Sequence, residues 1–379
     1  MGRFPHRPLE PDPGNAGVGT ISKSETALRG GFCFEEFAMQ MRAARYHGPG
    51  KPLRLEMVPV PPGKPGEVLV RVKAAGVCYT DTHFLSGVLD LGIHPLTLGH
   101  EIAGEVAKLP AGASDLQVGD RVLVYYYATC GRCHWCRTDR ANLCPQMVAE
   151  YGFTADGGYA EYVRVPAANL VKLPAGLDLA EAATLGCSVT TAIHAARTIA
   201  DLKVGETVVV YGVGGVGLGL IQFCKLTGAR VLAVSRSAEK RAKAVQLGAD
   251  AALDGNGNVA EAVRALTGGE GADVVFELVG IEATMRHAVN ALRRRGRLVF
   301  IGYSKDLFVA SPLQLVIGEL TVTASVGNTF DELLQAVALA AAGKIKAVVD
   351  RTVTLDQLPG TLEALRKGEI VGRAVVTFG

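Results

Sequence analysis

The pattern of apolar and polar positions divides the chain into parts with different rhythms. Residues 68–77, 101–109 and 119–127 alternate apolar and polar side chains between Gly, Pro and Asp. Alternation with a period of two predicts short strands with one buried face, so this part is expected to form an antiparallel, barrel-like domain. Residues 1–40 are rich in Gly and Pro with little periodicity, which predicts a disordered extension.

From about Leu179 onward, apolar strand-like segments alternate with helical ones. The strand-like segments are residues 207–213, 230–235, 272–280 and 296–303. Strands that alternate with helices predict a parallel sheet with crossover helices, and therefore an α/β fold for this part. The tail has a helical segment at 331–343 and a strand-like one at 373–378, and it is expected to return to the first domain.

Charge and composition exclude several classes of partner. The chain has 379 residues with 39 basic and 37 acidic side chains, a net charge of +2, which gives no argument for nucleic acid or an anionic membrane. The longest uncharged run, residues 207–224, is broken by glycine and shorter than the ~20 residues needed to cross a bilayer. No secretory signal is visible, so a cytoplasmic protein with reduced cysteines is expected.

A glycine-rich turn follows the first strand of the parallel sheet. The sequence YGVGGVG has the spacing G-x-G-x-x-G at Gly212, Gly214 and Gly217, between a strand and a helix. The first glycine permits a tight turn, the second lets the backbone approach a pyrophosphate, and the third lets helix and strand pack closely. With Gly215 and Val216 at the helix start, where free N–H groups face an anion, the turn predicts a dinucleotide site.

The end of the next strand bears on the choice between NAD and NADP. An acid at this position favours NAD, because its carboxylate accepts hydrogen bonds from the ribose 2′-hydroxyl. Here the acid position holds Ser235, followed by Arg236. A small hydroxyl beside a guanidinium suits a 2′-phosphate, so the expected cofactor is NAD(P) with a preference for NADP(H). Lys240, one helical turn further, is also expected to reach the ribose or its phosphate.

Four cysteines form a compact motif at Cys130, Cys133, Cys136 and Cys144. Four thiolates suit tetrahedral zinc, whereas a redox Cys-x-x-Cys pair would leave the other two unexplained. An iron–sulfur cluster is an alternative, because Pro145 follows the last cysteine as in bacterial ferredoxins. However, the gap before that cysteine is too long for the ferredoxin motif, and no second set of cluster cysteines follows. Four sulfurs close the coordination shell, so a structural metal site is expected here.

Three further candidate ligands stand in polar surroundings. The segments GVCYTDTH, LGHEIAG and LGCSVTTA contain Cys78, His100 and Cys187. A lone cysteine is more often a small buried hydrophobic residue, which is the interpretation for Cys33 and Cys224. Each of the three candidates is weak alone, and only their combination with the other motifs indicates a second metal site.

These motifs, in this order, resemble the zinc-dependent medium-chain alcohol dehydrogenases. The resemblance covers residues 41–379 and implies a GroES-like catalytic domain interrupted by a Rossmann domain with a doubly wound parallel sheet. The implied boundaries are 41–187 plus 326–379 for the catalytic domain and 188–325 for the cofactor domain. It also implies two zinc ions per chain, an alcohol, aldehyde or ketone substrate, and a homodimer or homotetramer.

The resemblance implies roles for the metal ligands and their neighbours. Cys78, His100 and Cys187 resemble the catalytic zinc ligands, a Cys2His set known for alcohol dehydrogenase that leaves a fourth position open. Glu101 resembles the acid beside the metal. Asp81 resembles the carboxylate that orients the ligand histidine.

The resemblance also implies a proton relay and a contact with the cofactor. Thr80 resembles the hydroxyl that bonds the substrate oxygen and passes its proton through the cofactor ribose to His83. Arg373 matches a basic residue near the cofactor phosphates. Tyr79 departs from the family, which often has Arg or His at this position to contact the pyrophosphate.

The expected activity is reversible hydride transfer between a primary or secondary alcohol and NAD(P). One alternative within the same superfamily is a zinc-poor reductase of activated C=C bonds in quinones or enoyl thioesters. Many such reductases lack the catalytic zinc ligands, which this chain retains. Another alternative is a non-catalytic, lens-type protein on this fold, which would have no reason to retain both metal sites and Thr80.

Overall fold

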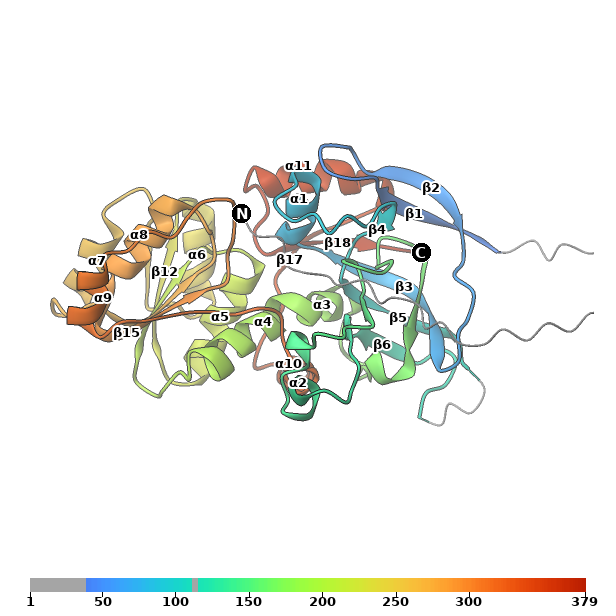
Figure 1. Ribbon diagram of the computed structural model, residues 1–379, viewed down its shortest axis with the longest axis horizontal. Coiled ribbons are helices and arrows are strands. Elements are labelled where there is room, and N and C mark those ends of the chain that lie inside the picture. Colours follow the sequence, from blue (N-terminus) through green and yellow to red (C-terminus); the bar gives the residue numbers. More distant parts are fainter. Residues whose placement is uncertain (1–38, 111–114) are drawn as a thin grey trace, which may run out of the picture. The chain divides into compact units, whose positions relative to one another are not determined.

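A computed structural model of the chain describes residues 39–110 and 115–379 (Figure 1). The disordered extension expected at residues 1–40 falls on residues 1–38, which lie outside the described residues. Its last residue was assigned wrongly, because strand β1 (Gln40–Tyr46) already begins there and pairs antiparallel with β2 (Arg54–Pro59).

The first half of the chain contributes most of a largely antiparallel sheet. Its strand order is β10-β6-β5-β3-β18-β17, and β9 also pairs with β3. The strands are β3 (Glu67–Val77), β5 (Glu101–Lys108), β6 (Arg121–Val124), β9 (Tyr162–Pro166), β10 (Leu170–Lys172), β17 (Val349–Val353) and β18 (Arg373–Thr377). A smaller sheet has the order β2-β1-β4, and β7 pairs with β8; the bounds are β4 (Leu96–Thr97), β7 (Tyr127–Ala128) and β8 (Ala149–Glu150).

The last strand of the chain lies inside this sheet. β18 pairs antiparallel with β3, with Val375 opposite Gly76, and parallel with β17. The tail therefore completes the sheet that the first half begins, and it brings Arg373 beside the end of β3.

The middle of the chain forms a parallel sheet with the order β13-β12-β11-β14-β15-β16. Counted within this sheet the order is 3-2-1-4-5-6, which is that of a Rossmann fold. The strands are β11 (Thr207–Tyr211), β12 (Arg230–Ser235), β13 (Ala251–Asp254), β14 (Ala272–Glu277), β15 (Leu292–Phe300) and β16 (Thr321–Ala324). The predicted fold class, a GroES-like domain with a Rossmann domain, is confirmed.

Both faces of the parallel sheet are covered by helices (Figure 1). Alternate residues of β11 enter different cores: Val208 and Val210 pack with α5, while Val209 and Tyr211 pack with α7 and α8. Burial on both faces explains why β11 has no apolar–polar alternation. The helices of this half are α5 (Gly215–Leu226), α6 (Ala238–Gln246), α7 (Val259–Leu266), α8 (Glu282–Asn290) and α9 (Pro312–Gly318).

A continuous helical stretch from Leu179 to Ile199 joins the two sheets. It consists of α3 (Leu179–Thr184), a π-helical turn (Leu185–Val189), α4 (Thr190–Ile193) and a second π-helical turn (His194–Ile199). Asp178 caps its start by accepting from the amides of Ala180 and Glu181. α3 contacts β3 and β5, and α4 contacts α5, so this stretch touches both halves of the structure.

The remaining helices belong to other parts of the described chain. They are α1 (Tyr79–Ser86), α2 (His134–Arg137), α10 (Phe330–Ala341), α11 (Leu358–Arg366) and single 3-10 turns at Ala141–Leu143, Ala167–Asn169 and Leu355–Gln357. Within the part of the chain that the structure describes, none of the helices is long and apolar enough to cross a membrane.

Candidate active site

Four potential ligand side chains meet where strands β3 and β5 run side by side. Cys78 follows the last residue of β3 and precedes α1, while His100 and Glu101 stand at the start of β5. Cys187 arrives from the π-helical turn in the joining stretch. One ligand atom from each of these four residues lies within 4.8 Å of the others.

Two glycines allow the ligand-bearing strands to approach so closely. Gly76 is the register partner of Glu101, and a Cβ at this glycine would collide with the Glu101 carboxylate. Gly99, just before His100, has a φ of +88° and lies against the ring of Tyr159. A larger residue at either glycine would force the ligands apart, because the neighbouring atoms are already in contact.

The chemistry of this cluster fits a zinc ion. Cys78, His100 and Cys187 are all buried, and both thiols are free. Hydrogen bonding to Cys187 lowers the pKa of the Cys78 thiol well below its ordinary value, so that it presents a thiolate. Two sulfurs and an imidazole are the ligand types that zinc prefers, and they leave a position open for another ligand.

Asp81 is a buried carboxylate beside this cluster. Its Oδ2 accepts hydrogen bonds from the Cys78 amide at 3.0 Å and the Tyr159 hydroxyl at 2.7 Å. Its Oδ1 is buried without a hydrogen-bond partner among the described residues, as is Nδ1 of His100. Burial opposes the charged imidazole, but the Cys78 thiolate and the charge of Asp81 outweigh it and raise the pKa of His100 to about 9. These facts support the orienting role that the sequence predicts for Asp81.

Glu101 and Arg373 connect this cluster with the glycine turn. Arg373 Nε donates to Glu101 Oε1 at 2.9 Å, and its Nη2 lies 3.5 Å from Cys78 Sγ. A Cβ at Gly215 would collide with the guanidinium of Arg373. Burial raises the pKa of Glu101 to about 7, although the positive charge of Arg373 opposes this rise. The arginine is therefore buried between the metal cluster and the cofactor turn.

The four-cysteine loop forms a separate, compact cluster. The sulfur–sulfur distances are 3.5 Å for Cys133–Cys136 and Cys130–Cys144, 3.8 Å for Cys133–Cys144 and 3.9 Å for Cys130–Cys136. Sulfurs placed ~2.3 Å from one tetrahedral zinc are separated by about 3.8 Å. The spacing thus fits a single ion and is too small to enclose a cluster of several irons.

Three groups that could handle a proton lie beside the three-ligand cluster. Thr80 Oγ1 is 3.6 Å from Cys78 Sγ. His83 stands one turn along α1 with its ring half-buried, and burial lowers its pKa below 6.5. The ring of Tyr303 lies 4.5 Å from that of His83, and the phenol of this tyrosine interacts with the Thr80 hydroxyl.

Tyr303 was not predicted from the sequence. It follows β15, and a Cβ at Gly280 would collide with its backbone, so the tyrosine is held in place from the side of the parallel sheet. The signal available was its position just after a strand of that sheet, because ligands bind outside the carboxyl ends of such strands. Tyr79, which stands where the family often has a basic residue, is 45% exposed beside His83.

The glycine turn has the geometry that its spacing predicts. Gly212 has a φ of +111°, and its amide donates to the Val234 carbonyl at 3.0 Å. A Cβ at Gly217 would collide with the carbonyl oxygen of Gly212, whereas a Cβ at Gly214 would meet open space. The space at Gly214, before helix α5 starts at Gly215, is what a bound pyrophosphate requires.

The residues expected around the cofactor ribose lie at the end of β12 and in the first turn of α6. Ser235 Oγ accepts from the Ser237 amide at 3.3 Å, and Arg236 is exposed. Lys240 is partly buried, which lowers its pKa, and its Nζ lies near Gly368. The neighbouring Arg241 is not available, because it donates to the Ser235 carbonyl at 2.7 Å and pairs with Asp254.

Comparisons with known proteins agree with this architecture. A family model described as an alcohol dehydrogenase GroES-like domain matches residues 64–175, and one described as a zinc-binding dehydrogenase matches residues 215–342. An alcohol dehydrogenase of Geobacillus stearothermophilus is 35% identical over 341 residues, covering 89% of this chain and 99% of that protein. A NAD-dependent alcohol dehydrogenase of Sulfurisphaera tokodaii is 36% identical over 352 residues, with coverage of 89% and 99%.

A solved structure gives the same result in three dimensions. The alcohol dehydrogenase of Aeropyrum pernix superposes with a TM-score of 0.85 at 35% sequence identity. The match covers 89% of this chain and 100% of that chain.

Proposed function

The chain belongs to the zinc-dependent medium-chain alcohol dehydrogenase family, and from this premise we propose that it transfers hydride reversibly between a primary or secondary alcohol and NAD(P). The observation that carries the proposal is that Cys78, His100 and Cys187 lie close enough together to bind one ion. Arg373 lies between this group and the glycine turn, because it contacts Cys78 and packs against Gly215. Metal ligands and a dinucleotide turn at one place allow an alcohol carbon to face a nicotinamide.

In this proposal, some residues of the site bind the metal and others transfer the proton. Bound zinc would supply Lewis acidity, which lowers the pKa of an alcohol oxygen toward neutrality, and the nicotinamide would accept the hydride. Cys78, His100 and Cys187 would hold the metal, with Asp81 orienting the imidazole. Thr80 is placed to receive the alcohol proton, because its hydroxyl lies next to Cys78.

His83 completes this proton path in our proposal. Its lowered pKa keeps the imidazole neutral at pH 7, and a neutral imidazole can accept a proton. Thr80 and His83 stand one helical turn apart on α1, and His83 would be the final acceptor of the proton that Thr80 receives. Glu101 would remain the acid beside the metal, held in place by Arg373.

We also propose that the cofactor preference is for NADP. Ser235 replaces the acid that would repel a 2′-phosphate, and the exposed Arg236 and the partly buried Lys240 supply positive charge near it. The relative from Sulfurisphaera tokodaii is named NAD-dependent, so this preference would be a difference between the two proteins.

The second zinc, the domain boundaries and the assembly state belong to the same proposal. The four-cysteine loop would hold a structural ion, and the Rossmann domain would span residues 188–325 between catalytic segments 41–187 and 326–379. A homodimer or homotetramer is supported by exposed apolar side chains on α9, where Leu313, Val316 and Ile317 are 67%, 74% and 62% exposed.

The proposal is tested by metal analysis combined with substrate turnover. The purified protein is analysed for zinc per chain and assayed on primary, secondary and aromatic alcohols with NAD and with NADP. Two zinc ions with turnover would support the proposal, and the better cofactor would decide the preference. A single zinc, released only on unfolding, would refute the ligand assignment of Cys78, His100 and Cys187 and favour a C=C reductase.

A further inference from the structure

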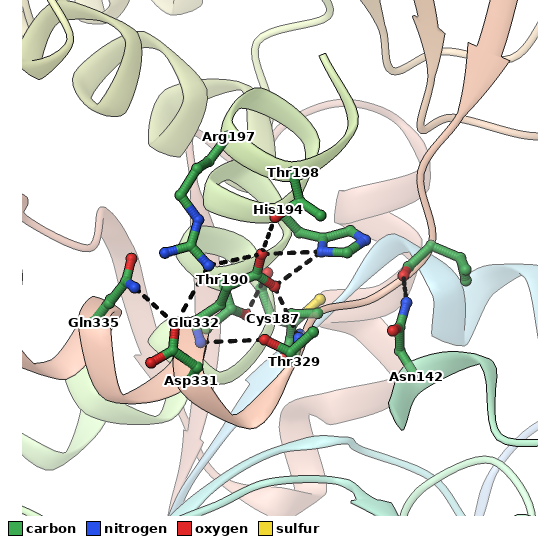
Figure 2. Close-up of polar contacts among 12 residues, drawn as sticks. Asn142, Cys187, Thr190, His194, Arg197, Thr198, Thr329, Asp331, Glu332 and Gln335 are labelled. Atoms are coloured by element: carbon green, nitrogen blue, oxygen red, sulfur yellow. Dashed lines mark hydrogen bonds and ion pairs between the residues drawn. The ribbon is translucent and has the colours of Figure 1, made fainter. Parts of the chain in front are cut away.

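A buried hydrogen-bonded pair outside the two cysteine-containing clusters joins two helices that are far apart in sequence. Nδ1 of His194 lies 3.0 and 2.9 Å from the two carboxylate oxygens of Glu332 (Figure 2). Glu332 is fully buried and His194 is 4% exposed. The proposed chemistry uses neither residue.

Glu332 is the centre of a dense set of hydrogen bonds. Its carboxylate also accepts from Thr198 Oγ1 at 2.7 Å, from the Thr329 amide at 2.8 Å and from Arg197 Nη2 at 3.4 Å. Burial acts to raise its pKa, but the donors, with His194 first among them, lower the pKa of Glu332 below its ordinary value. The carboxylate is therefore charged, so His194 donates to it, and such charge-assisted hydrogen bonds are among the stronger ones.

Three of these donors, His194, Arg197 and Thr198, lie on the helical stretch that carries Cys187. His194 and Thr198 stand two to three turns beyond this cysteine in the same stretch, within the second π-helical turn. Thr190 Oγ1 donates to the Cys187 carbonyl at 3.2 Å, which ties α4 back to the ligand-bearing turn. π-helical turns are rare and occur frequently at functional sites.

The other end of the network reaches the four-cysteine loop. Asn142, between Cys136 and Cys144 in sequence, donates from Nδ2 to the Val326 carbonyl at 2.8 Å (Figure 2). The Asn328 carbonyl accepts from the Tyr125 hydroxyl at 2.8 Å. The segment from Val326 to Glu332 thus contacts the four-cysteine loop at its start and the Cys187 helix at its end.

Two local features constrain the segment between these two contacts. Gly327 has a φ of +59°, and a Cβ there would collide with the Tyr127 hydroxyl. Thr329 and Glu332 form a capping box that fixes the first turn of α10. A fixed segment can transmit the position of one loop to the other.

We propose that Glu332, through His194 and Thr198, is a positioning residue for Cys187, and that the segment Val326–Glu332 links the four-cysteine loop to this ligand. The inference rests on the proposed function in taking Cys187 as a metal ligand. Groups that hold a ligand in place commonly change metal affinity by ~10–100-fold when they are removed.

The test compares Glu332→Gln with Asp331→Asn. Asp331 is the adjacent residue of α10, its side chain is 53% exposed, and it bonds to Gln335 and Arg197, so Asp331→Asn removes the same charge without touching His194. Zinc release to a chromogenic chelator is followed for each variant, together with the absorption spectrum of the cobalt-substituted protein and hydrogen exchange of residues 184–199.

We expect Glu332→Gln to release one of two zinc ions ~10–100-fold faster, to shift the cobalt bands of the site with mixed sulfur and nitrogen ligands, and to speed exchange of residues 184–199. Asp331→Asn should match the wild type in all three. A folded Glu332→Gln protein with wild-type release, spectrum and exchange would overturn the inference. If Glu332→Gln does not fold, Thr198→Val removes a single donor and should give a smaller effect in the same direction; no effect would again overturn it.

The link to the four-cysteine loop has its own variant. Asn142→Ala should accelerate release from the mixed-ligand site although the residue lies in the other loop, and unchanged release there would refute the link. Failure of the proposed function would be seen separately, as a single zinc in the wild type. In that case the exchange of residues 184–199 in Glu332→Gln and Asp331→Asn still decides whether Glu332 positions Cys187.

Discussion

Arg373 and Glu101 form a buried ion pair, with Nε and Oε1 2.9 Å apart, between strands that are 272 residues apart in sequence. The arginine is 5% exposed and the glutamate is fully buried. Because the same guanidinium lies against Cys78 and beside Gly215, a change at this pair reaches both the metal ligands and the cofactor turn.

Removing one partner of this pair should be costly, and removing both should cost less. Arg373→Met leaves the carboxylate of Glu101 buried without its cation, which is expected to lower the free energy of unfolding by about 3–5 kcal/mol. Adding Glu101→Gln should recover part of that loss, because no buried charge is then left alone. Denaturant unfolding of the two single variants and the double variant measures the coupling.

A surface pair provides the control for this experiment. Arg366 and Glu363 lie on α11 at 2.7 Å, with both side chains largely exposed, so Arg366→Gln should leave stability unchanged. Additive losses for Arg373→Met and Glu101→Gln would contradict a coupled pair.

Metal content should separate the two cysteine clusters. Cys187→Ser is expected to leave one zinc per chain, a folded protein and no alcohol oxidation, because the four-cysteine loop keeps its own ligands. Cys224→Ser is the matched control, since this cysteine is fully buried but stands apart from both clusters. Atomic absorption and circular dichroism check the outcome; two zinc ions in Cys187→Ser would remove Cys187 from the ligand set.

The preference between cofactors should depend on Ser235 and Arg236. Arg236→Gln is expected to lower kcat/KM with NADP by roughly 10- to 150-fold, the equivalent of about 1.5–3 kcal/mol for a hydrogen bond to a charged group, and to leave NAD unaffected. Ser235→Asp should invert the preference, because a carboxylate repels the 2′-phosphate and binds the 2′-hydroxyl. Steady-state kinetics with both cofactors measure this.

The control for the cofactor variants is another exposed arginine of the same domain. Arg286 on α8 pairs with Glu282 on the surface, so Arg286→Gln should change neither cofactor's kinetics. An equal loss with NAD and NADP in Arg236→Gln would show that this arginine does not recognise the 2′-phosphate.

The acid side of the pH–rate profile should report His83. Burial lowers its pKa below 6.5, so the imidazole stays neutral and able to accept a proton above that pH, and kcat/KM for alcohol oxidation should fall as the pH drops through the lowered value. His83→Gln should lose this limb and lower the rate on the order of 10²-fold. His47→Gln, which alters a histidine paired with Glu56, is the control. A profile unaltered by His83→Gln would exclude His83 from the proton path.

Local sequence patterns predicted the features that depend on nearby residues. The strand, glycine turn and helix occupy consecutive positions, and the cysteines at 130 to 144 share one loop. Their spacing alone therefore predicted that each set lies together, as the structure shows. The change in hydrophobic rhythm predicted an antiparallel part and a parallel α/β part, whereas the GroES-like and Rossmann folds were implied by the resemblance.

Features that depend on long-range contacts were predicted only through resemblance, or not at all. Cys78 and Cys187 meet from separate elements, and no spacing relates them. Glu332 and His194 are hydrogen-bonded although 138 residues separate them in sequence. From the sequence alone, Glu332 could not be distinguished from a solvent-exposed glutamate on a helix, because its burial depends on the position of the opposite helix. The sequence pattern indicates only that Tyr303 lies at the end of a strand. Its contact with His83 could not be predicted, because the two residues follow strands of different sheets, which meet only in the folded protein.

The order of strands indicates that the cofactor-binding half could be exchanged as a unit. The parallel sheet uses an unbroken stretch of chain, Thr207 to Ala324, while the strands on either side of it in sequence pair with each other through β3 and β18. Protein engineering could therefore replace this stretch with the corresponding domain of a relative that prefers the other cofactor. The inserted stretch would have to keep a glycine at position 215, because a larger residue there would collide with Arg373, which lies outside the exchanged stretch.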